Sequence, residues 1–404
     1  MSLTRRSLLK LAAASTVSPA FADTSAGPDP ITVGSVLDTS GIFQLYGRPM
    51  DKAVTLAVEE INATGGLLDR PLRKIAYDTR SDMAMYSEHA TRLAAIDKVD
   101  VVHGAVLSAA REVIRPILRE AQTLYFYNTQ YEGGVCDRNT FCTGVTPAQQ
   151  TEVLVPEAIE RWGKKIYILA ADYNYGQITA RRIEKYAMQH GGEVVAAEFF
   201  ALDVSDFSEA IANIQDAKPD IVMSVLVGGA HLSFYRQWSA TGMNRRIPLA
   251  STTMGAGNEH TALTREEGDG IMMVYSYSKQ LQSNENKWFL RRWQRRFGTI
   301  EDLHELAVAT YQGVHLWAQG VRAAGSVERD KVIEALEGEV SFRGPVGRVS
   351  LDAKTHHVVT PVHLIEVNDQ KMKVTKSFGE RQPVDTQAVC DLVANPADTT
   401  QYEI

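Results

Sequence analysis

Long apolar runs are nearly absent from this chain of 404 residues. The apolar run near the N-terminus, Leu8 to Val17, is far shorter than the roughly 20 residues that a membrane-spanning helix needs. No later run approaches that length. We therefore expect no segment of the mature chain to span a membrane.

An excess of positive charge is also missing. The chain holds 42 Lys and Arg against 49 Asp and Glu, which gives a net charge of −7. A nucleic acid partner is not expected, because such proteins present clustered basic residues. With 44% apolar and 23% charged residues, the composition is that of an ordinary globular protein. The length exceeds what one hydrophobic core usually serves, which predicts two domains.

Motifs of common enzyme sites are missing as well. There is no G-x-S-x-G turn, no G-x-x-x-x-G-K-[ST] loop, and no G-x-G-x-x-G after the first predicted strand. No histidine is paired by the sequence with Cys136, as a cysteine nucleophile would require. The neighbours His356 and His357 would point to opposite faces of a strand and make a poor pair of metal ligands. We expect no enzyme, no cofactor and no metal site.

The N-terminus has the features of an export signal. Arg5-Arg6 precede the apolar run, and a small-x-small cleavage pattern ends at Ala22. These features predict a signal peptide over residues 1–22. The stretch TRRSLLK resembles the twin-arginine signal. The mature protein is expected in the periplasm.

Strand and helix patterns alternate from residue 31 onward. The predicted strands cover residues 31–37, 75–77, 99–103, 124–127, 165–170, 193–199, 220–225 and 270–277. The predicted helices cover residues 51–62, 83–96, 110–122, 153–162, 176–190, 206–215, 230–241, 284–297 and 303–324. Strands joined by helical crossovers form parallel sheets with helices on both faces. Two successive sets predict an α/β fold with two doubly wound parallel-sheet lobes, followed by a hairpin-like pair over 342–351 and 359–367.

Three cysteines allow one disulfide in an oxidising compartment and leave one thiol over. Cys136 and Cys142 are the favoured pair, since they would close a small loop and leave Cys390 free. Pairing of Cys390 with either of the others, or three reduced thiols, are the alternatives.

Polar residues follow several predicted strands. Ser108 comes after the strand 99–103, Thr129 after the strand 124–127, and Tyr175 after the strand 165–170. Ligands of open α/β sheets bind beyond the carboxyl ends of the strands. Helix N-termini at these points offer unpaired N–H groups that suit a carbonyl or carboxylate oxygen.

Several stretches carry a likeness to a known family. They are ITVGSVLDTSG, VEEINATGGLLDRPL, VVHGAVLSAAREVIRPIL, DYNYGQ, DFSEAIANIQDAKPDIV and AVATYQGVHLWAQGV. The chain after the leader resembles the type I periplasmic solute-binding proteins of the branched-chain amino acid, amide and urea ABC transporter family. YNTQYEGGVCDRNTFCTGVTPAQQ and GPVGRVSLDAKTHHV are most similar to segments of the urea and short-chain amide binders.

The resemblance implies two lobes joined by three crossovers, with the ligand in the cleft between them and hinge closure around it. The crossovers are expected near Thr143–Gln149, Val274–Lys279 and Phe342–Gly347. The first lobe would comprise residues 31–147 and 276–345, the second lobe residues 148–275 and 346–380, and the extended C-terminal tail residues 381–404.

Site residues are carried over from the family position by position. Ser108 and Thr129 match hydroxyls that hold the ligand's carbonyl or carboxylate oxygen, and Tyr127 matches an aromatic wall of the amide binders. Tyr175 matches a tyrosine of the second lobe that closes over the ligand. Thr253 falls where the second lobe offers another polar side chain. Weaker matches, from the loops after their strands, are Tyr46 and Gly229.

The predicted ligand is urea or a short-chain amide. Amino acid binders place an acid in the second lobe for the ammonium group, whereas residues 252–255, TTMG, supply none, and Glu259 is a few residues away. A buried ammonium without a carboxylate is costly, so a neutral ligand fits better. Gly176 and Val106 depart from the amide binders. An ABC permease is the expected partner, and the alternatives are an amino acid binder and a periplasmic ligand sensor.

Overall fold

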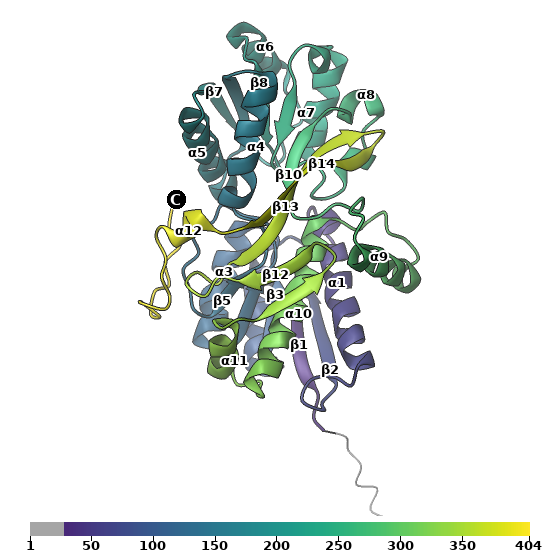
Figure 1. Cartoon of the computed structure of the whole chain (residues 1–404), viewed down its shortest axis with the longest axis vertical. Coiled ribbons are helices and arrows are strands. Elements are labelled where there is room, and N and C mark those ends of the chain that lie inside the picture. The colour runs from purple at the N-terminus through teal and green to yellow at the C-terminus, as the bar shows by residue number, and fades with distance from the viewer. Residues whose placement is uncertain (1–27) are drawn as a thin grey trace, which may run out of the picture.

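The computed structural model describes residues 28–404, and the predicted signal peptide over residues 1–22 lies outside them. The described chain forms two α/β lobes that are stacked along the long axis of the molecule (Figure 1). Each lobe contains a sheet whose strands are mainly parallel and are connected by helices. The predicted α/β class with parallel sheets is confirmed.

The first lobe is built on a five-stranded parallel sheet of order β2-β1-β3-β4-β5. Its strands are β1 (Ile31–Leu37), β2 (Leu72–Asp78), β3 (Val101–Gly104), β4 (Leu124–Tyr127) and β5 (Thr140–Cys142). Its helices are α1 (Gln44–Ala63), α2 (Met83–Thr91) with a π-helical turn (Arg92–Ile96), α3 (Ser108–Glu120), α9 (Asn284–Phe297), α10 (Glu305–Ala324) and α11 (Arg329–Leu336).

The second lobe is built on the parallel strands β10-β9-β8-β6-β7. They are β6 (Lys165–Ala171), β7 (Glu193–Phe200), β8 (Ile221–Val225), β9 (Leu249–Ser251) and β10 (Met272–Tyr275). Its helices are α4 (Pro147–Trp162), α5 (Asn174–Gln189), α6 (Ser208–Ala217), α7 (Gly229–Ala240) and α8 (Arg265–Gly268), with short 3-10 turns at Met243–Arg245 and Glu259–Thr261.

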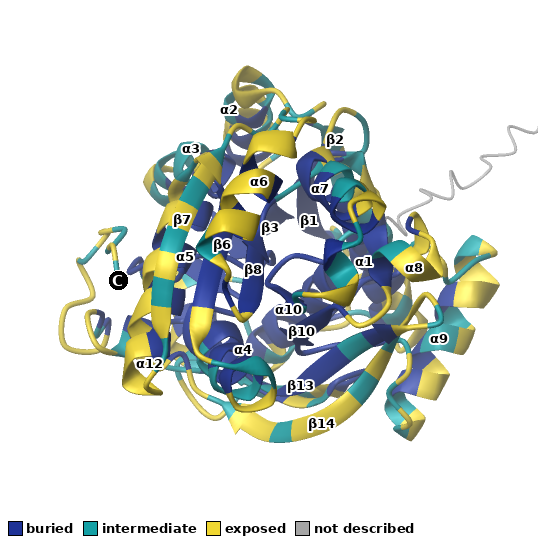
Figure 2. Ribbon diagram, turned by 90° about the horizontal axis from the view of Figure 1, so that it is seen from above, coloured by how far each residue is buried: buried dark blue, intermediate teal, exposed yellow. Residues whose placement is uncertain are grey.

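Burial follows the layered arrangement of each lobe. The strands β3, β8 and β10 are buried between helices, while α6 and α9 turn exposed faces outward (Figure 2). The edge strand β7 alternates between exposed and half-buried residues, because only one of its faces is covered.

Four further strands end the fold. β11 (Ser341–Gly344) and β12 (Gly347–Leu351) form a tight hairpin, and β13 (Val358–Asn368) pairs with β14 (Lys371–Arg381). The start of β13 pairs with β12, and its later part, from His363 to Glu366, pairs antiparallel with β10. β13 therefore runs from one lobe into the other (Figure 1).

The prediction that residues 346–380 belong to the second lobe is wrong for its first part. Val349 and Leu351 of β12 pack in one apolar cluster with Leu316 and Trp317 of α10 in the first lobe. The third crossover accordingly lies inside β13 and not near residues 342–347. Because β13 is long enough to pair with strands of both lobes, this crossover is a continuous strand and contains no loop.

The C-terminal segment corrects two further predictions. Cys136 is bonded to Cys390, while Cys142 is a buried free thiol in β5, so the predicted Cys136–Cys142 pair is wrong. Residues 381–404 are not a loose extended tail. They begin with the short helix α12 (Val384–Gln387) and return to the first lobe, where Tyr402 donates its N–H to the Gly134 carbonyl at 2.8 Å.

Candidate functional site

A small pocket lies between the lobes at the carboxyl ends of the strands. Its volume is about 40 Å³. The first lobe contributes the start of α1, the loop before α3, the segment after β4 and the start of α10, and the second lobe contributes the start of α5 and the loops after β8 and β9. The lining residues are Tyr46, Val106, Leu107, Ser108, Thr129, Gln130, Tyr173, Tyr175, Val227, Thr253, Ala256 and Leu306.

Most of the residues named from the sequence meet in this pocket. The predicted residues that line it are Ser108, Thr129, Tyr175, Thr253 and Tyr46. They come from five separate segments, which parallel strands ending at the same sheet edges bring together.

Two predicted residues do not line the pocket. Tyr127 is fully buried, and its hydroxyl donates to the Val106 carbonyl at 2.8 Å. Its ring lies against the Arg111 guanidinium, 5.0 Å from the ring centre, so Tyr127 supports the loop before α3 and forms no wall of the pocket. Gly229 begins α7 outside the lining, where an added Cβ would meet nothing within 4 Å.

Two hydroxyls of the pocket donate their protons to buried carboxylates. Ser108 Oγ donates to Glu132 Oε2 at 2.5 Å, and the Tyr46 hydroxyl donates to Glu259 Oε1 at 2.9 Å. An ionised carboxylate only accepts hydrogen bonds, so the direction of both bonds is fixed. The lone pairs of Ser108 Oγ and of the Tyr46 oxygen remain available to accept.

Two threonines are oriented in the same way by backbone carbonyls. Thr129 Oγ1 donates to the Ala105 carbonyl at 3.1 Å, and Thr253 Oγ1 donates to the Leu226 carbonyl at 2.6 Å. These hydroxyls also have only acceptor capacity left. Both hydroxyl protons of Ser108 and Thr129 are bound within the protein, so these groups offer acceptors to a ligand, and their role in holding a carbonyl or carboxylate oxygen stays a prediction.

Gln130 is a pocket residue that the sequence analysis missed. Its Nε2 donates across the cleft to the Tyr175 hydroxyl at 3.3 Å and to the Thr252 carbonyl at 2.9 Å. Its Oε1 is buried without a partner among the described residues. Gln130 follows directly on Thr129 after β4, and this position at a strand end is the signal that would have found it.

The N-terminus of α3 supplies donors to the same pocket. Ser108 is the first residue of α3, and the preceding Leu107 gives no side-chain cap. The first N–H groups of a helix have no partner within the helix and carry partial positive charge. These N–H groups can therefore donate hydrogen bonds to a carbonyl oxygen of a ligand.

Neither nearby carboxylate is free to bind an ammonium group. Glu132 accepts from Ser108 and forms an ion pair with Arg111 at 2.8 Å. Glu259 accepts from Tyr46 and from two backbone N–H groups, and His231 Nε2 lies 3.4 Å from Glu259 Oε1. Burial opposes ionisation of Glu259, but the nearby imidazole and these hydrogen bonds prevail and lower its pKa to about 2. Both oxygens of Glu259 already accept hydrogen bonds from the protein.

Close packing explains the glycine after Tyr175. A Cβ on Gly176 would lie 1.9 Å from the Ala171 carbonyl oxygen, so only glycine allows α5 to begin so close to the end of β6. This contact fixes the position of Tyr175 at the pocket.

Comparison with known proteins now decides the family. A family model described as Periplasmic binding protein matches residues 30–372. The chain belongs to this family. It is therefore a substrate-binding protein of the ABC transporter type and not an enzyme, with a small-molecule ligand and a permease partner. No helix within residues 28–404 is long and apolar enough to cross a membrane, and no three His, Cys, Asp or Glu side chains in that range group as metal ligands.

Curated relatives of this family member share about a quarter of its sequence. A Leu/Ile/Val-binding protein homolog 6 from Brucella melitensis is 23% identical over 353 residues, which cover 86% of this chain and 90% of the relative. A leucine-, isoleucine-, valine-, threonine- and alanine-binding protein from Pseudomonas aeruginosa is 25% identical over 342 residues, which cover 83% of this chain and 89% of the relative.

Solved structures show the same fold. A solute-binding protein of an ABC transporter from R. palustris, in complex with 4-hydroxybenzoate, has a TM-score of 0.79 and 25% identity, with 88% of this chain and 98% of that chain covered. A branched-chain amino acid transporter substrate-binding protein from Streptococcus pneumoniae, in complex with isoleucine, has a TM-score of 0.76 and 22% identity, with 87% and 100% covered.

Proposed function

We propose that this periplasmic binding protein captures a short-chain amide or urea in the pocket between its lobes and delivers it to an ABC permease. The observation that carries the proposal is the direction of the hydrogen bonds. Ser108, Thr129, Thr253 and Tyr46 present acceptors, because their protons are bound to the protein. A ligand rich in N–H groups satisfies such a pocket.

Amides and urea also match the remaining polar groups. Each carries N–H groups on one side and a single carbonyl oxygen on the other. The unpartnered Oε1 of Gln130 would accept one N–H, and the N–H groups at the start of α3 would bind the carbonyl oxygen. The apolar lining, which includes Val106, Leu107 and Leu306, suits a short alkyl group.

Charge and size favour the same class. No Asp, Glu, Lys or Arg among residues 28–404 lines the pocket, Glu132 is paired with Arg111, and Glu259 accepts hydrogen bonds from the protein. A carboxylate or ammonium of the ligand would be buried without an opposite charge. The pocket volume of about 40 Å³ is small, which favours a small ligand.

A branched-chain amino acid is the second candidate. The curated relatives from Brucella melitensis and Pseudomonas aeruginosa are described as binders of such amino acids. An ammonium group also donates several N–H bonds, so the acceptor hydroxyls alone do not discriminate against it. What disfavours an amino acid is the lack of an uncompensated carboxylate beside the pocket.

Isothermal titration calorimetry of the purified mature protein with acetamide, urea and L-leucine tests the proposal. We expect binding of acetamide or urea, and at least tenfold weaker binding in Gln130→Met, which keeps the side-chain length and removes the acceptor. Gln177→Met is the matched control, because Gln177 is exposed on α5 outside the pocket and the affinity of this variant should equal that of the parent. Binding of leucine alone, with no heat from either neutral ligand, overturns the proposal in favour of the second candidate.

Export and hinge closure belong to the same proposal. The two lobes supply opposite walls of the pocket, so a ligand that contacts both favours the closed arrangement.

The predicted twin-arginine signal would take the protein to the periplasm. Fractionation of cells that express the full chain should find the mature protein in the periplasm. Retention in the cytoplasm of a double variant, Arg5→Lys with Arg6→Lys, would support this route.

A further inference from the structure

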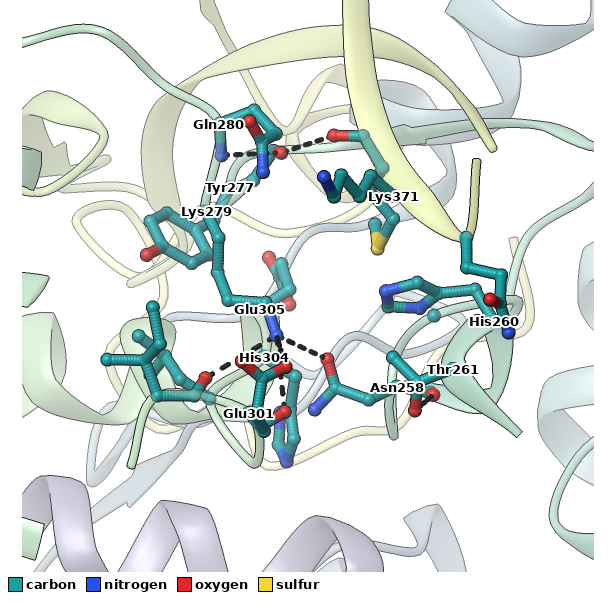
Figure 3. A pocket seen from close by; sticks show the side chains of 16 residues that line it. Asn258, His260, Thr261, Tyr277, Lys279, Gln280, Glu301, His304, Glu305 and Lys371 are labelled. Carbon is teal, nitrogen blue, oxygen red and sulfur yellow. Dashed lines mark hydrogen bonds and ion pairs between the residues drawn. The ribbon is translucent and has the colours of Figure 1, made fainter. Parts of the chain in front are cut away.

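A second cavity of about 170 Å³ lies between the lobes and shares no lining residue with the ligand pocket (Figure 3). The first lobe contributes the segments 277–280 and 300–305, which flank α9. The second lobe contributes residues between Gly255 and Thr261 and the turn into β14. An occupant would therefore contact both lobes.

Two buried polar atoms of this cavity have no partner among the described residues. They are Nδ1 of His260 and Oε2 of Glu305, and each of these residues is 2% exposed. Glu305 uses only Oε1, which accepts from Ser276 Oγ at 2.8 Å. In Figure 3 the His260 ring and the Glu305 carboxylate extend toward the interior of the cavity from opposite lobes. Buried polar atoms are rarely left unpaired, so these two indicate a ligand.

The cavity also contains an ammonium group without a close carboxylate. Lys279 Nζ donates to three neutral oxygens, Asn258 Oδ1 at 3.4 Å and the carbonyls of Ile300 at 3.4 Å and Glu301 at 3.2 Å. The Glu301 carboxylate is 4.0 Å away and mostly exposed. Lys279 and Glu305 form no ion pair with each other within the described chain. One wall therefore presents an ammonium group whose nearest carboxylate lies 4.0 Å away, and another presents a carboxyl group with one unpartnered oxygen among the described residues.

We propose that this cavity is a second small-molecule site, which binds a small α-amino acid as its zwitterion. The ammonium group of the ligand would donate to Glu305 and His260, and its carboxylate would pair with Lys279. A zwitterion brings both opposite charges without adding net charge to a buried space, whereas a simple anion or cation would satisfy only one wall.

The position of the cavity couples it to the ligand pocket. His260 directly follows Glu259, which holds Tyr46 of the pocket, and Glu305 directly precedes Leu306 in the pocket wall. An amino acid that bridges the lobes in this cavity favours the closed arrangement. It therefore strengthens binding of the ligand in the neighbouring ligand pocket. The effect is reciprocal by linkage.

Titration calorimetry of the mature protein with glycine and L-alanine tests this site. Binding should weaken at least tenfold in Glu305→Gln and in Lys279→Met. It should weaken less in Gln130→Met, which removes interlobe hydrogen bonds but no contact within this cavity. Glu328→Gln is the matched control, because it removes an exposed carboxylate that lies outside the cavity. Acetate and methylammonium, each carrying one of the two charges, should bind at least tenfold more weakly than glycine.

Two outcomes overturn the inference. One is the absence of binding by glycine and alanine to a parent protein that is folded by circular dichroism. The other is weakening of amino acid binding by Gln130→Met but not by Glu305→Gln, which would place the amino acid in the ligand pocket. The proposed amide function fails separately, through loss of the acetamide and urea response.

Discussion

Tyr46 and Glu259 meet across the cleft, where the phenol of the first lobe donates to the carboxylate of the second at 2.9 Å. Both side chains are almost fully buried, and backbone N–H groups of Gly255 and Gly257 complete the shell of the carboxylate. A single buried acid thus orients a pocket hydroxyl and remains ionised. Its effect on stability depends on its pKa.

Glu259→Gln should destabilise the protein by about 3 kcal/mol at pH 7, because the pKa of Glu259 is lowered to about 2 from an ordinary value near 4.5. A pKa that is lower in the folded than in the unfolded state stabilises the protein at pH values above the ordinary pKa. This stabilisation is lost as the pH falls toward 2. Urea unfolding at pH 7 and pH 3.5 should show a smaller gap between variant and parent at the lower pH. Glu266→Gln, at an exposed position, is the control and should leave the midpoint unchanged. A gap that stays constant with pH would contradict this assignment.

Glu305 should have the opposite pH dependence. Burial raises its pKa to about 7, so the folded state holds this proton more tightly than the unfolded state. Stability is therefore lost as the pH rises from about 4.5 to 7, by roughly 3 kcal/mol in total. Glu305→Gln keeps the contact to Ser276 and avoids this loss, so it should match the parent at pH 5 and exceed its unfolding free energy at pH 8. Equal stability at both pH values would show that Glu305 is paired in solution.

At the scale of elements, the C-terminal segment is attached to the loop that follows β4. The disulfide joins Cys136 to Cys390, and the Cys136 N–H donates to the Thr400 carbonyl at 2.9 Å. Asp385 at α12 accepts from Thr146 Oγ1 at 3.0 Å and from the Ala148 N–H at 2.9 Å, at the start of α4 in the second lobe. The segment therefore contacts both lobes beside the first crossover.

Replacing both bonded cysteines by serine should lower the free energy of unfolding by about 2–5 kcal/mol, because a crosslink over 254 residues restricts the unfolded chain. Urea unfolding of Cys136→Ser/Cys390→Ser against the parent measures the effect. Cys142→Ala removes the free thiol and should change stability by about 1 kcal/mol or less. Non-reducing peptide mapping that found Cys142 bonded to Cys136 would contradict the observed pairing.

At the scale of the whole molecule, direct hydrogen bonds hold the lobes together across the pocket. Gln130 of the first lobe binds Tyr175 and Thr252 of the second, and Tyr46 binds Glu259. β13 also connects the lobes, since it pairs with β12 at its start and with β10 further along (Figure 1). We therefore expect the loss of such a bond to favour separation of the lobes.

Tyr46→Phe should shift the ligand-free protein toward the open arrangement. The variant keeps the ring and removes one interlobe hydrogen bond to a charged group, a change of about 1.5–3 kcal/mol. Small-angle X-ray scattering without ligand should give a larger radius of gyration than the parent. Tyr402→Phe, whose hydroxyl binds Asp398 within the tail, is the matched control. An unchanged radius would show that this bond does not limit opening.

The sequence by itself determined the local elements and the family, and five of its predicted site residues line the pocket. Apolar periodicity predicted β1 at the same bounds that the structure has, and Ser108, Thr129 and Tyr175 follow strands whose ends must meet at one edge. Such features depend on short stretches of chain and on rules of parallel sheets, so they can be read locally.

Only the tertiary structure decided which partner each group has. Sequence proximity favoured Cys142 as the partner of Cys136, but Cys142 lies in β5, and the folded tail brings Cys390 to Cys136. Tyr127 turns to the Val106 carbonyl, and Ser108 gives its proton to Glu132. Bond direction and pairing depend on which distant groups meet when the chain is packed, and a linear pattern does not contain that information.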